Sequence, residues 1–266
     1  MLTVTVCDPV PTMDPAGQAD YGIRFGWGPE AARALARGSR ATVVVDVLSF
    51  MTSVDIAVSR GAIVHPLRWN DERAAEVAAE LKAELAVGRG DADNPNGSPW
   101  SLSPSSLLDI PAGTRILLPS PNGATVTLAA ADDCSPVFGS CLRNASAVAE
   151  AAASTGGPVA VIAAGERWPD GQLRVAVEDL IGAGAVIGAL VAAGSAGSPS
   201  PEARTATAAH AAMAQDLVAT LTDCVSGREL IARHFGADVL LAAEADVSTT
   251  VPVLEGGAFS ASSRWR

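Results

Sequence analysis

Short apolar runs rich in β-branched residues alternate along this chain with longer alanine-rich segments. Residues 41–45 read ATVVV and residues 159–164 read VAVIAA, so the two runs contain one hydroxyl group and no charge. Strands of this kind are typical of a parallel sheet that is covered on both faces. Since they alternate with helical segments, the pattern predicts an α/β protein, a three-layer α/β/α sandwich with a mainly parallel or mixed sheet.

The turn signals between these segments give the expected elements. We expect strands at 2–6, 41–45, 63–67, 115–118, 135–138 and 159–164. We expect helices at 29–36, 50–59, 72–87, 124–131, 144–153, 178–192 and 202–224, and another that opens at 226–229. The 266 residues suffice for one α/β domain over 1–266, with an irregular loop at 88–114, a linker at 194–201 and an irregular tail at 246–266.

Composition limits the classes of binding partner and indicates where in the cell the protein is located. A net charge of −11 argues against nucleic acid, which needs a basic face. The sequence has neither a membrane-length apolar run nor a basic segment before an apolar one, so we expect neither a membrane span nor a signal peptide. The four cysteines, Cys7, Cys134, Cys141 and Cys224, form no CxxC pair and fit a reduced, cytoplasmic protein.

Ligands of open α/β sheets bind beyond the carboxyl ends of the strands, which selects the loops after Asp46, Ser120, Gly139 and Gly165. Asp46 ends a buried strand, where a carboxylate is costly unless it is paired or bound to a cation. It is therefore either a metal ligand or nucleophile, or a helix cap or hydrogen-bond acceptor of the loop.

Hydroxyl, amide and guanidinium groups follow these strands and are candidates for binding an anion. Thr52 and Ser53 lie in the first turns of the helix after Asp46 and could meet a phosphate. The turn Ser120-Pro121-Asn122-Gly123 precedes another helix, so it is either an anion-binding nest or an ordinary turn.

The loop after residue 139 carries Cys141, Arg143 and Asn144. Arg143 is either a clamp for a phosphate or sulfonate, or a surface arginine. Cys141 has no histidine nearby in sequence, so a packed thiol is favoured over a nucleophile.

Two acidic residues open the helix at 178–192. Glu178 and Asp179 follow a loop that contains Gly165, Glu166 and Arg167. Acids in a first helical turn favour the helix dipole, which is one explanation for the pair. The alternative is that both face Asp46 and form an all-oxygen Mg²⁺ site.

Taken in order, these segments resemble the 2-phosphosulfolactate phosphatase family from about residue 41 to about residue 257. The resemblance is carried by the motifs VVVDVLSFMTS with AVSRGA, NGSP, SPNGAT, LRNASAVA, AAGE with VEDLIGAG, and SGREL with VPVLEGG. It implies an α/β/α fold and a Mg²⁺-dependent phosphatase of coenzyme M biosynthesis that acts on a phosphorylated, sulfonated hydroxy acid. The positions that match recurrent family residues are Asp46, Asn122, Gly123, Asn144, Glu178 and Asp179.

The chain departs from this family at three places. Ser49 and Phe50 follow Asp46-Val47-Leu48, where the family usually has an arginine and small residues. Residues 88–90 read GRG where the family tends to have Gly-Glu-Arg, and SPNG stands in place of a Thr-Asn-Gly turn. The alternatives to the family substrate are therefore a phosphatase for another phosphorylated hydroxy acid and a protein that binds a small anion without catalysis.

We expect metal-assisted hydrolysis of a small anionic phosphate ester. Asp46, Glu178 and Asp179 are the candidate catalytic and Mg²⁺-binding residues, and Asp46 as a direct nucleophile is a variant. The candidate substrate-binding residues are Thr52, Ser53, Ser120, Asn122, Gly123, Arg143, Asn144, Gly165 and Arg167. The alanine-rich helix at 202–224 is either a homodimer surface or ordinary packing.

Overall fold

The computed structural model describes residues 17–68, 73–88, 98–131, 135–194 and 196–265. The strand expected at 2–6 lies outside these residues. Nine strands form one sheet in the order β1-β7-β2-β6-β10-β11-β3-β5-β4. Their bounds are β1 Ile23–Trp27, β7 Val159–Ala163, β2 Ala41–Val45, β6 Val137–Ser140, β10 Pro252–Glu255, β11 Ala258–Ala261, β3 Ile63–Arg68, β5 Arg115–Ser120 and β4 Glu84–Leu85.

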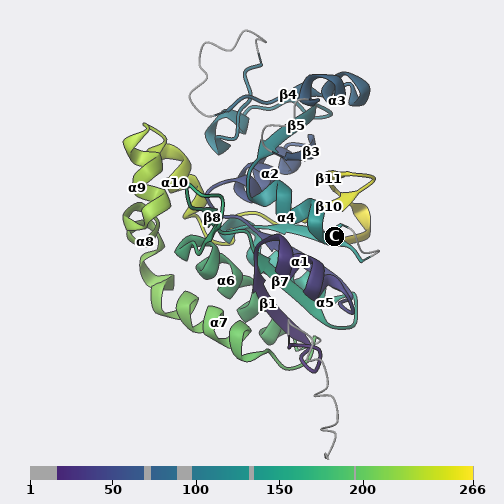
Figure 1. The fold of residues 1–266 in the computed structure, drawn as a ribbon, viewed down its shortest axis with the longest axis vertical. Helices are drawn as coiled ribbons and strands as arrows, with labels where there is room; N and C mark the ends of the chain where they lie inside the picture. Colours follow the sequence, from purple (N-terminus) through teal and green to yellow (C-terminus); the bar gives the residue numbers. More distant parts are fainter. Residues whose placement is uncertain (1–16, 69–72, 89–97, 132–134, 195, 266) are drawn as a thin grey trace, which may run out of the picture.

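The sheet, whose strands are labelled in Figure 1, contains two groups of parallel strands, and the pairings show that the two groups run in opposite directions. Strands β1, β7, β2 and β6 are parallel to their neighbours, as are β3, β5 and β4. Between the groups, each of the three pairings β6–β10, β10–β11 and β11–β3 is antiparallel. Three reversals leave β3 and β5 opposed to β2, so the carboxyl ends of β2 and β5 point to opposite edges of the sheet.

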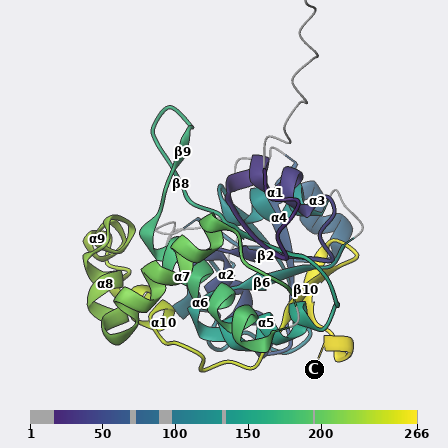
Figure 2. The ribbon, with the colours of Figure 1, turned by 90° about the horizontal axis from the view of Figure 1, so that it is seen from below.

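Helices cover both faces of the sheet and confirm the expected α/β sandwich. Helices α1 (Gly28–Ala36) and α4 (Gly123–Ala130) lie on one side of β2 and β6 in Figure 2. Helices α5 (Ala145–Ala153), α6 (Val177–Ala193) and α7 (Pro201–Met213) lie on the other side. Helix α2 (Phe50–Ser59) shares its apolar core with α1 and α4, and α3 (Ala74–Leu81) packs beside β4 and β5.

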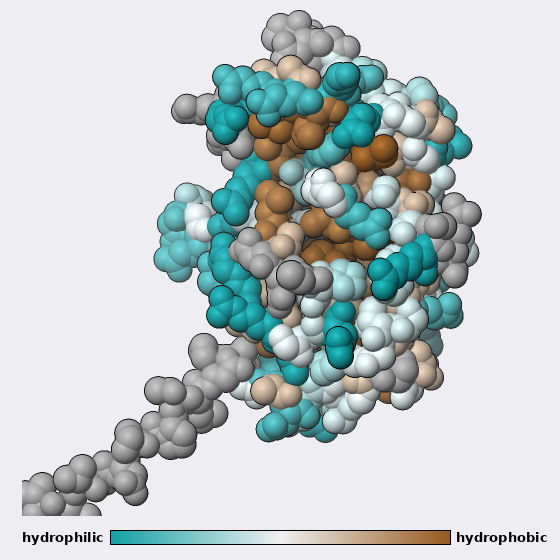
Figure 3. Space-filling model, turned by 90° about the vertical axis from the view of Figure 1, so that its right-hand side faces the viewer, coloured by the Kyte–Doolittle hydropathy of each residue, from teal (hydrophilic) through white to brown (hydrophobic). Residues whose placement is uncertain are grey.

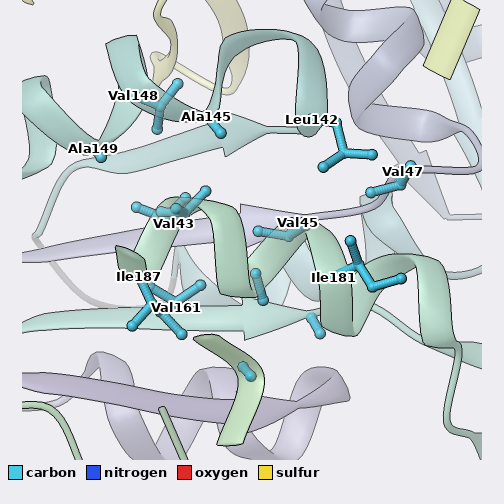
Figure 4. Close-up of a cluster of buried hydrophobic side chains, with 14 of the residues drawn as sticks. Val43, Val45, Val47, Leu142, Ala145, Val148, Ala149, Val161, Ile181 and Ile187 are labelled. Atoms are coloured by element: carbon cyan, nitrogen blue, oxygen red, sulfur yellow. The ribbon is translucent and has the colours of Figure 1, made fainter. Parts of the chain in front are cut away.

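The two cores follow from the alternation of side chains along each strand. Val43 and Val45 of β2 face the α5 and α6 side, where Figure 4 shows them beside Ile181 and Ile187. Val44, between them, faces the core that contains α1, α2 and α4. A strand whose two faces are both buried needs a continuous apolar sequence, which explains the run ATVVV.

Helix α4 contacts both β2 and β5, although β6, β10, β11 and β3 lie between them in the sheet. The sheet must therefore curve around α4. This curvature brings the loop that precedes α4 back to the end of β2, even though β5 and β2 run in opposite directions.

Three expectations for the helices need correction or refinement. The helix expected at 72–87 ends at Leu81, because Lys82 adopts a left-handed conformation with φ 51°, and β4 follows. The helix expected at 202–224 is divided into α7, a 3₁₀ turn and α8 (Leu217–Asp223), and the Asp216 side chain caps the start of α8. Helix α7 packs on α6, where Gly184 admits the backbone of Ala206, so this part of the alanine-rich segment is used for internal packing.

The tail expected to be irregular contains the antiparallel hairpin β10–β11, which completes the centre of the sheet. Its turn is Gly256-Gly257, with φ values of 59° and 82° that favour glycine. Within residues 98–114 of the expected irregular loop, the regular element is a 3₁₀ turn at Pro104–Leu107.

Helices α9 (Val225–Ala232) and α10 (Gly236–Ala242) follow α8 at the side of the sheet (Figure 1). A separate hairpin, β8 (Glu166–Arg167) with β9 (Leu173–Arg174), projects from the body (Figure 2). None of the helices in the described part of the chain combines the length and apolar character that crossing a membrane requires.

Candidate active site

Asp46 lies immediately after β2 and is only 5% exposed. Its Oδ1 accepts a hydrogen bond of 2.9 Å from the backbone N–H of Phe50, the first residue of α2. Asp46 also lines a pocket of about 420 Å³. The structure confirms the role of hydrogen-bond acceptor at the start of a helix, whereas the role of metal ligand or nucleophile stays a prediction for a residue that also lines a ligand-sized space.

Gly123 lets the start of α4 come close to this carboxylate. A Cβ atom at Gly123 would lie 2.5 Å from Asp46 Oδ2 and 2.6 Å from Cδ1 of Phe50. Real Cβ atoms do not approach other atoms so closely, so only glycine fits at this position without a shift. The positive end of the α4 dipole consequently lies beside Asp46.

Asn122 and Glu166 connect the loop before α4 with the loop after β7. Asn122 Nδ2 donates a hydrogen bond of 2.7 Å to Glu166 Oε2. Burial, followed by the charges of Asp46 and Glu178, raises the pKa of Glu166 to about 7. A carboxyl group with this pKa exchanges its proton near neutral pH, which suits acid–base chemistry.

Asp179 holds the ends of β2 and β7 together. Its Oδ1 accepts a hydrogen bond of 2.7 Å from Val47 N–H, and its Oδ2 accepts one of 2.8 Å from Gly165 N–H. Burial, followed by the charges of Asp46 and Glu178, raises the pKa of Asp179. Since backbone donors already occupy both oxygens, the geometry gives Asp179 the role of positioning the two loops.

The pocket lies between these loops and helix α9. Its lining residues are Asp46, Leu48, Ser49, Gly88, Leu102, Ser120, Pro121, Asn122, Glu166, Ser226, Glu229, Leu230 and Arg233. Ser120, one of the predicted residues, is 2% exposed, and its Oγ accepts a hydrogen bond of 3.3 Å from Asn122 N–H. The structure thus brings together the predicted residues Asp46, Ser120, Asn122 and, by its contact with Asp46, Gly123.

Among the described residues, no group of three or more His, Cys, Asp or Glu side chains is disposed to hold a metal ion. Glu178 is 2% exposed and is near enough to Glu166 and Asp179 to raise the pKa of each. Asp46, Glu178 and Asp179 are therefore neighbours, but the three do not form the complete ligand set that the sequence predicted.

Thr52 and Ser53 are fully buried and do not line the pocket. The Thr52 hydroxyl donates a hydrogen bond of 2.7 Å to the carbonyl oxygen of Val47. The Ser53 hydroxyl donates one of 3.0 Å to the carbonyl oxygen of Leu102. Both hydroxyl groups stabilise loops around the pocket instead of meeting a ligand there.

Arg143 and Asn144 also lie away from the pocket. Arg143 Nε donates a hydrogen bond of 3.0 Å to Asp55 Oδ2, and its Nη1 pairs with Glu244. The Asn144 side chain is buried and accepts a hydrogen bond of 2.9 Å from Cys141 N–H. The proposed clamp is thus part of an internal ion pair, and burial raises the pKa of the Cys141 thiol to about 12, as suits a packed cysteine.

Arg167 borders a second, smaller cavity of about 290 Å³ that shares Asn122 and Glu166 with the pocket. Its Nη1 donates a hydrogen bond of 2.9 Å to Gly171 O within the projecting hairpin. Arg167 therefore lies on the outer side of Glu166, and Gly165 contributes its N–H to Asp179 instead of to the pocket.

Sequence reasoning did not select five polar residues that line the pocket: Ser49, Glu166, Ser226, Glu229 and Arg233. Glu166 comes two residues after the apolar run 159–164, much as Asp46 comes directly after the run 41–45. The position of Glu166 after a strand could therefore have identified it as a candidate site residue. Ser226, Glu229 and Arg233 lie on α9 or directly after it, and no local feature of this segment indicates that tertiary packing carries it to the ends of β2 and β7.

Larger cavities occur elsewhere but bring none of the predicted residues together. One of about 760 Å³ lies at the opposite ends of the strands and includes Arg40, Arg264 and Trp265. Another, of about 560 Å³, includes Val58, Val251 and Trp265. Apolar surface lies in the hollows on the side that is to the right in Figure 1, with hydrophilic residues around it (Figure 3).

Comparison with known families gives this arrangement its context. Residues 29–257 match the family model of 2-phosphosulpholactate phosphatase, and this range contains every residue of the pocket. A search of curated proteins finds no match. Because the family model covers most of the chain, the protein belongs to the 2-phosphosulpholactate phosphatase family.

Proposed function

We propose that the protein is a Mg²⁺-dependent phosphatase that hydrolyses a small phosphate monoester such as 2-phosphosulfolactate. The observation that carries this proposal is the meeting of Asp46, Asn122 and Glu166 in one pocket. The family supports a phosphatase of this type.

The chemistry of the pocket suits a Mg²⁺ ion that the protein shares with its substrate. Mg²⁺ is commonly bound by one or two carboxylates, with water and substrate phosphate as its remaining ligands. Asp46 and Glu166 both line the pocket, and the charge of Asp46 helps to raise the pKa of Glu166. These two residues would hold the cation, which when bound supplies positive charge against the phosphate and lowers the pKa of a bound water.

Residues of the chain itself would bind and orient the phosphate. Helices α2 and α4 both begin beside Asp46, at Phe50 and at Gly123. Helix N-termini favour anions through their N–H groups and dipoles. Asn122 fixes the Glu166 carboxyl through its hydrogen bond of 2.7 Å, and Asp179 fixes the two loops, so the site is organised before the ester arrives.

Two roles are available to Asp46, and the sequence left both open. It binds the cation, or it attacks the phosphorus atom and forms a phosphoryl intermediate. In either case Glu166 would be ionised where it holds the cation, so the leaving alkoxide would take its proton from water in the pocket.

Phosphate release from a panel of monoesters tests this proposal. The panel includes 2-phosphosulfolactate, and each ester is measured with Mg²⁺ and with EDTA. We expect release that requires Mg²⁺ and falls at least 100-fold in Asp46→Ala, whereas Asp170→Asn, on the exposed hairpin, serves as the control. Release that persists in EDTA or in Asp46→Ala would reject the assigned site.

Ser49 favours a second candidate function. It lines the pocket at the position where the resembled family usually has an arginine, so the pocket lacks that cation. A protein that binds a small anion without hydrolysing it, or a phosphatase for a different phosphorylated hydroxy acid, would fit this change. Calorimetric binding of an ester without phosphate release would select the first, and preference for another ester the second. A cytoplasmic location and a homodimer stay predictions from the sequence.

A further inference from the structure

Helix α9 and the residue after it turn one stripe of side chains toward the pocket. Ser226 and Leu230 are four residues apart and lie on one face of the helix, and Arg233 follows its last residue; all three line the pocket. Glu229, beside this stripe, also lines the pocket. With a rise of about 1.5 Å per residue, the stripe from Ser226 to Arg233 is roughly 10 Å long.

The Ser226 hydroxyl is the first sign that this stripe binds a ligand. Ser226 is 3% exposed, and its Oγ has no hydrogen-bond partner among the described residues. It lies in the first turn of α9, where Cys224 Sγ already accepts the N–H of Gly227 at 3.3 Å. Buried hydroxyl groups are rarely left without a partner, so an oxygen atom of a ligand is the expected completion.

The distribution of charge across the pocket is the second sign. Asp46 and Glu166 lie on the wall formed by the strand ends, whereas Arg233 directly follows the end of α9. The negative charge of Glu229 is offset by Arg174, whose Nη2 lies 3.4 Å from Glu229 Oε2. Among the described residues that line the pocket, Arg233 is the one cation, and it lies on a different wall from Asp46 and Glu166.

We propose that Ser226 and Arg233 form a subsite for a second anionic group of the substrate, a sulfonate or a carboxylate, while the phosphate lies at Asp46 and Asn122. This inference rests on the proposed function, because it assigns the orientation of the ester in the same pocket. A guanidinium group binds the oxygens of a carboxylate or a sulfonate through two parallel N–H groups, and a hydroxyl group donates to a third position.

The subsite makes a prediction about specificity that a general role in folding does not make. Loss of Arg233 should weaken binding of esters that carry a second acid more than binding of esters that do not. We therefore compare 2-phosphosulfolactate with phenyl phosphate, which has no second acid, in the full chain with Mg²⁺.

The variants are Arg233→Gln and Ser226→Ala, with Arg228→Gln as the matched control. Arg228 lies on the same helix but pairs with Asp223 at 3.4 Å, and its side chain is 70% exposed. In Arg233→Gln we expect the ratio of kcat/KM for 2-phosphosulfolactate to that for phenyl phosphate to fall about tenfold. In Ser226→Ala it should fall severalfold, and in Arg228→Gln it should stay the same. An equal loss for both esters, or no loss, would overturn the subsite.

Binding of sulfolactate, the acid without its phosphate, separates this inference from the proposed function. If the wild-type protein releases phosphate from no ester, the phosphatase proposal fails, but calorimetry with sulfolactate still tests the subsite. We expect the affinity for sulfolactate to fall about tenfold in Arg233→Gln and to be retained in Arg228→Gln. Equal affinity in wild type and Arg233→Gln, with both proteins folded by circular dichroism, would refute the subsite.

Discussion

Replacing Gly123 with alanine is a stringent test of how the site is assembled. The added methyl group would lie 2.5 Å from Asp46 Oδ2, 2.6 Å from Phe50 Cδ1 and 2.8 Å from Phe50 Cβ. Neither neighbour can move easily, since Phe50 is fully buried and its N–H holds Asp46 Oδ1 at 2.9 Å. The strain must therefore displace the start of α4, the Asp46 carboxylate or both.

The distances set the size of the effect. Overpacking of a buried site costs about 1–3 kcal/mol, and contacts below 3 Å with two fixed neighbours place Gly123→Ala near the upper end. Alanine offsets at most about 1 kcal/mol through its helix propensity. The expected net loss of about 2 kcal/mol corresponds to a fall in Tm of about 4–8 °C. Because the start of α4 or the Asp46 carboxylate must move by about 1 Å, we also expect about a 100-fold loss of phosphatase activity.

Urea unfolding and phosphate release, measured side by side, check both numbers. Gly188→Ala is the matched control, since a Cβ atom there in α6 would contact only Thr207 Cγ2, at 3.8 Å. That variant should be at least as stable as wild type. A Gly123→Ala protein with wild-type stability and activity would refute the close approach of α4 to Asp46.

Three other substitutions test separate parts of the site. The raised pKa of Glu166 means that its carboxyl group binds a proton more tightly in the folded protein than in the unfolded chain. The stabilisation that this proton gives is complete below pH 4.5 and is lost as the pH rises to about 7. In EDTA, the free energy of unfolding of the wild-type protein should fall by up to about 3 kcal/mol across this pH range, and Glu166→Gln should abolish that fall. A variant whose stability falls with pH as the wild type does in urea titrations would contradict the raised pKa. Asp179→Asn places an NH₂ group where the carboxylate accepts the N–H of Val47 or of Gly165. Urea unfolding should therefore show that the free energy of unfolding falls by about 1–3 kcal/mol. An unchanged free energy of unfolding would exclude the role of Asp179 in holding the two loops together. Arg143→Gln should cost about 3–5 kcal/mol in the same assay because it leaves the buried Asp55 carboxylate without its cationic partner. The KM of the folded variant for 2-phosphosulfolactate should not rise, and a large rise would return Arg143 to the substrate site.

Local sequence determined the elements nearest to the site. The strand at 41–45 and the helix at 50–59 have the expected bounds, because apolar β-branched residues and the following helix formers act over a few residues. The hairpin β10–β11 was not recognised, because its strands are four residues each and they are stabilised by β6 and β3, which are more than 100 residues away in sequence. Short strands of this kind depend on their partners in the sheet more than on their own pattern.

The candidate site was predictable to the extent that its residues follow strands. Asp46 directly follows β2, Asn122 and Gly123 follow β5 within three residues, and the three meet in the structure. The strand-end rule alone does not explain this meeting, since β5 runs opposite to β2 and reaches Asp46 through the curvature of the sheet around α4. The partner of Arg143 is Asp55, 88 residues earlier, and no local pattern reveals such a pairing.

A crystal structure with Mg²⁺ and orthovanadate, an analogue of phosphate in its transition state, would locate the site most directly. We expect vanadate between Asp46, Asn122 and Glu166, with Mg²⁺ against the Asp46 and Glu166 carboxylates and open space toward α9 for the rest of the substrate. Vanadate bound instead in the larger cavity at Arg40 and Arg264, with the first pocket empty, would contradict the assignment of the active site.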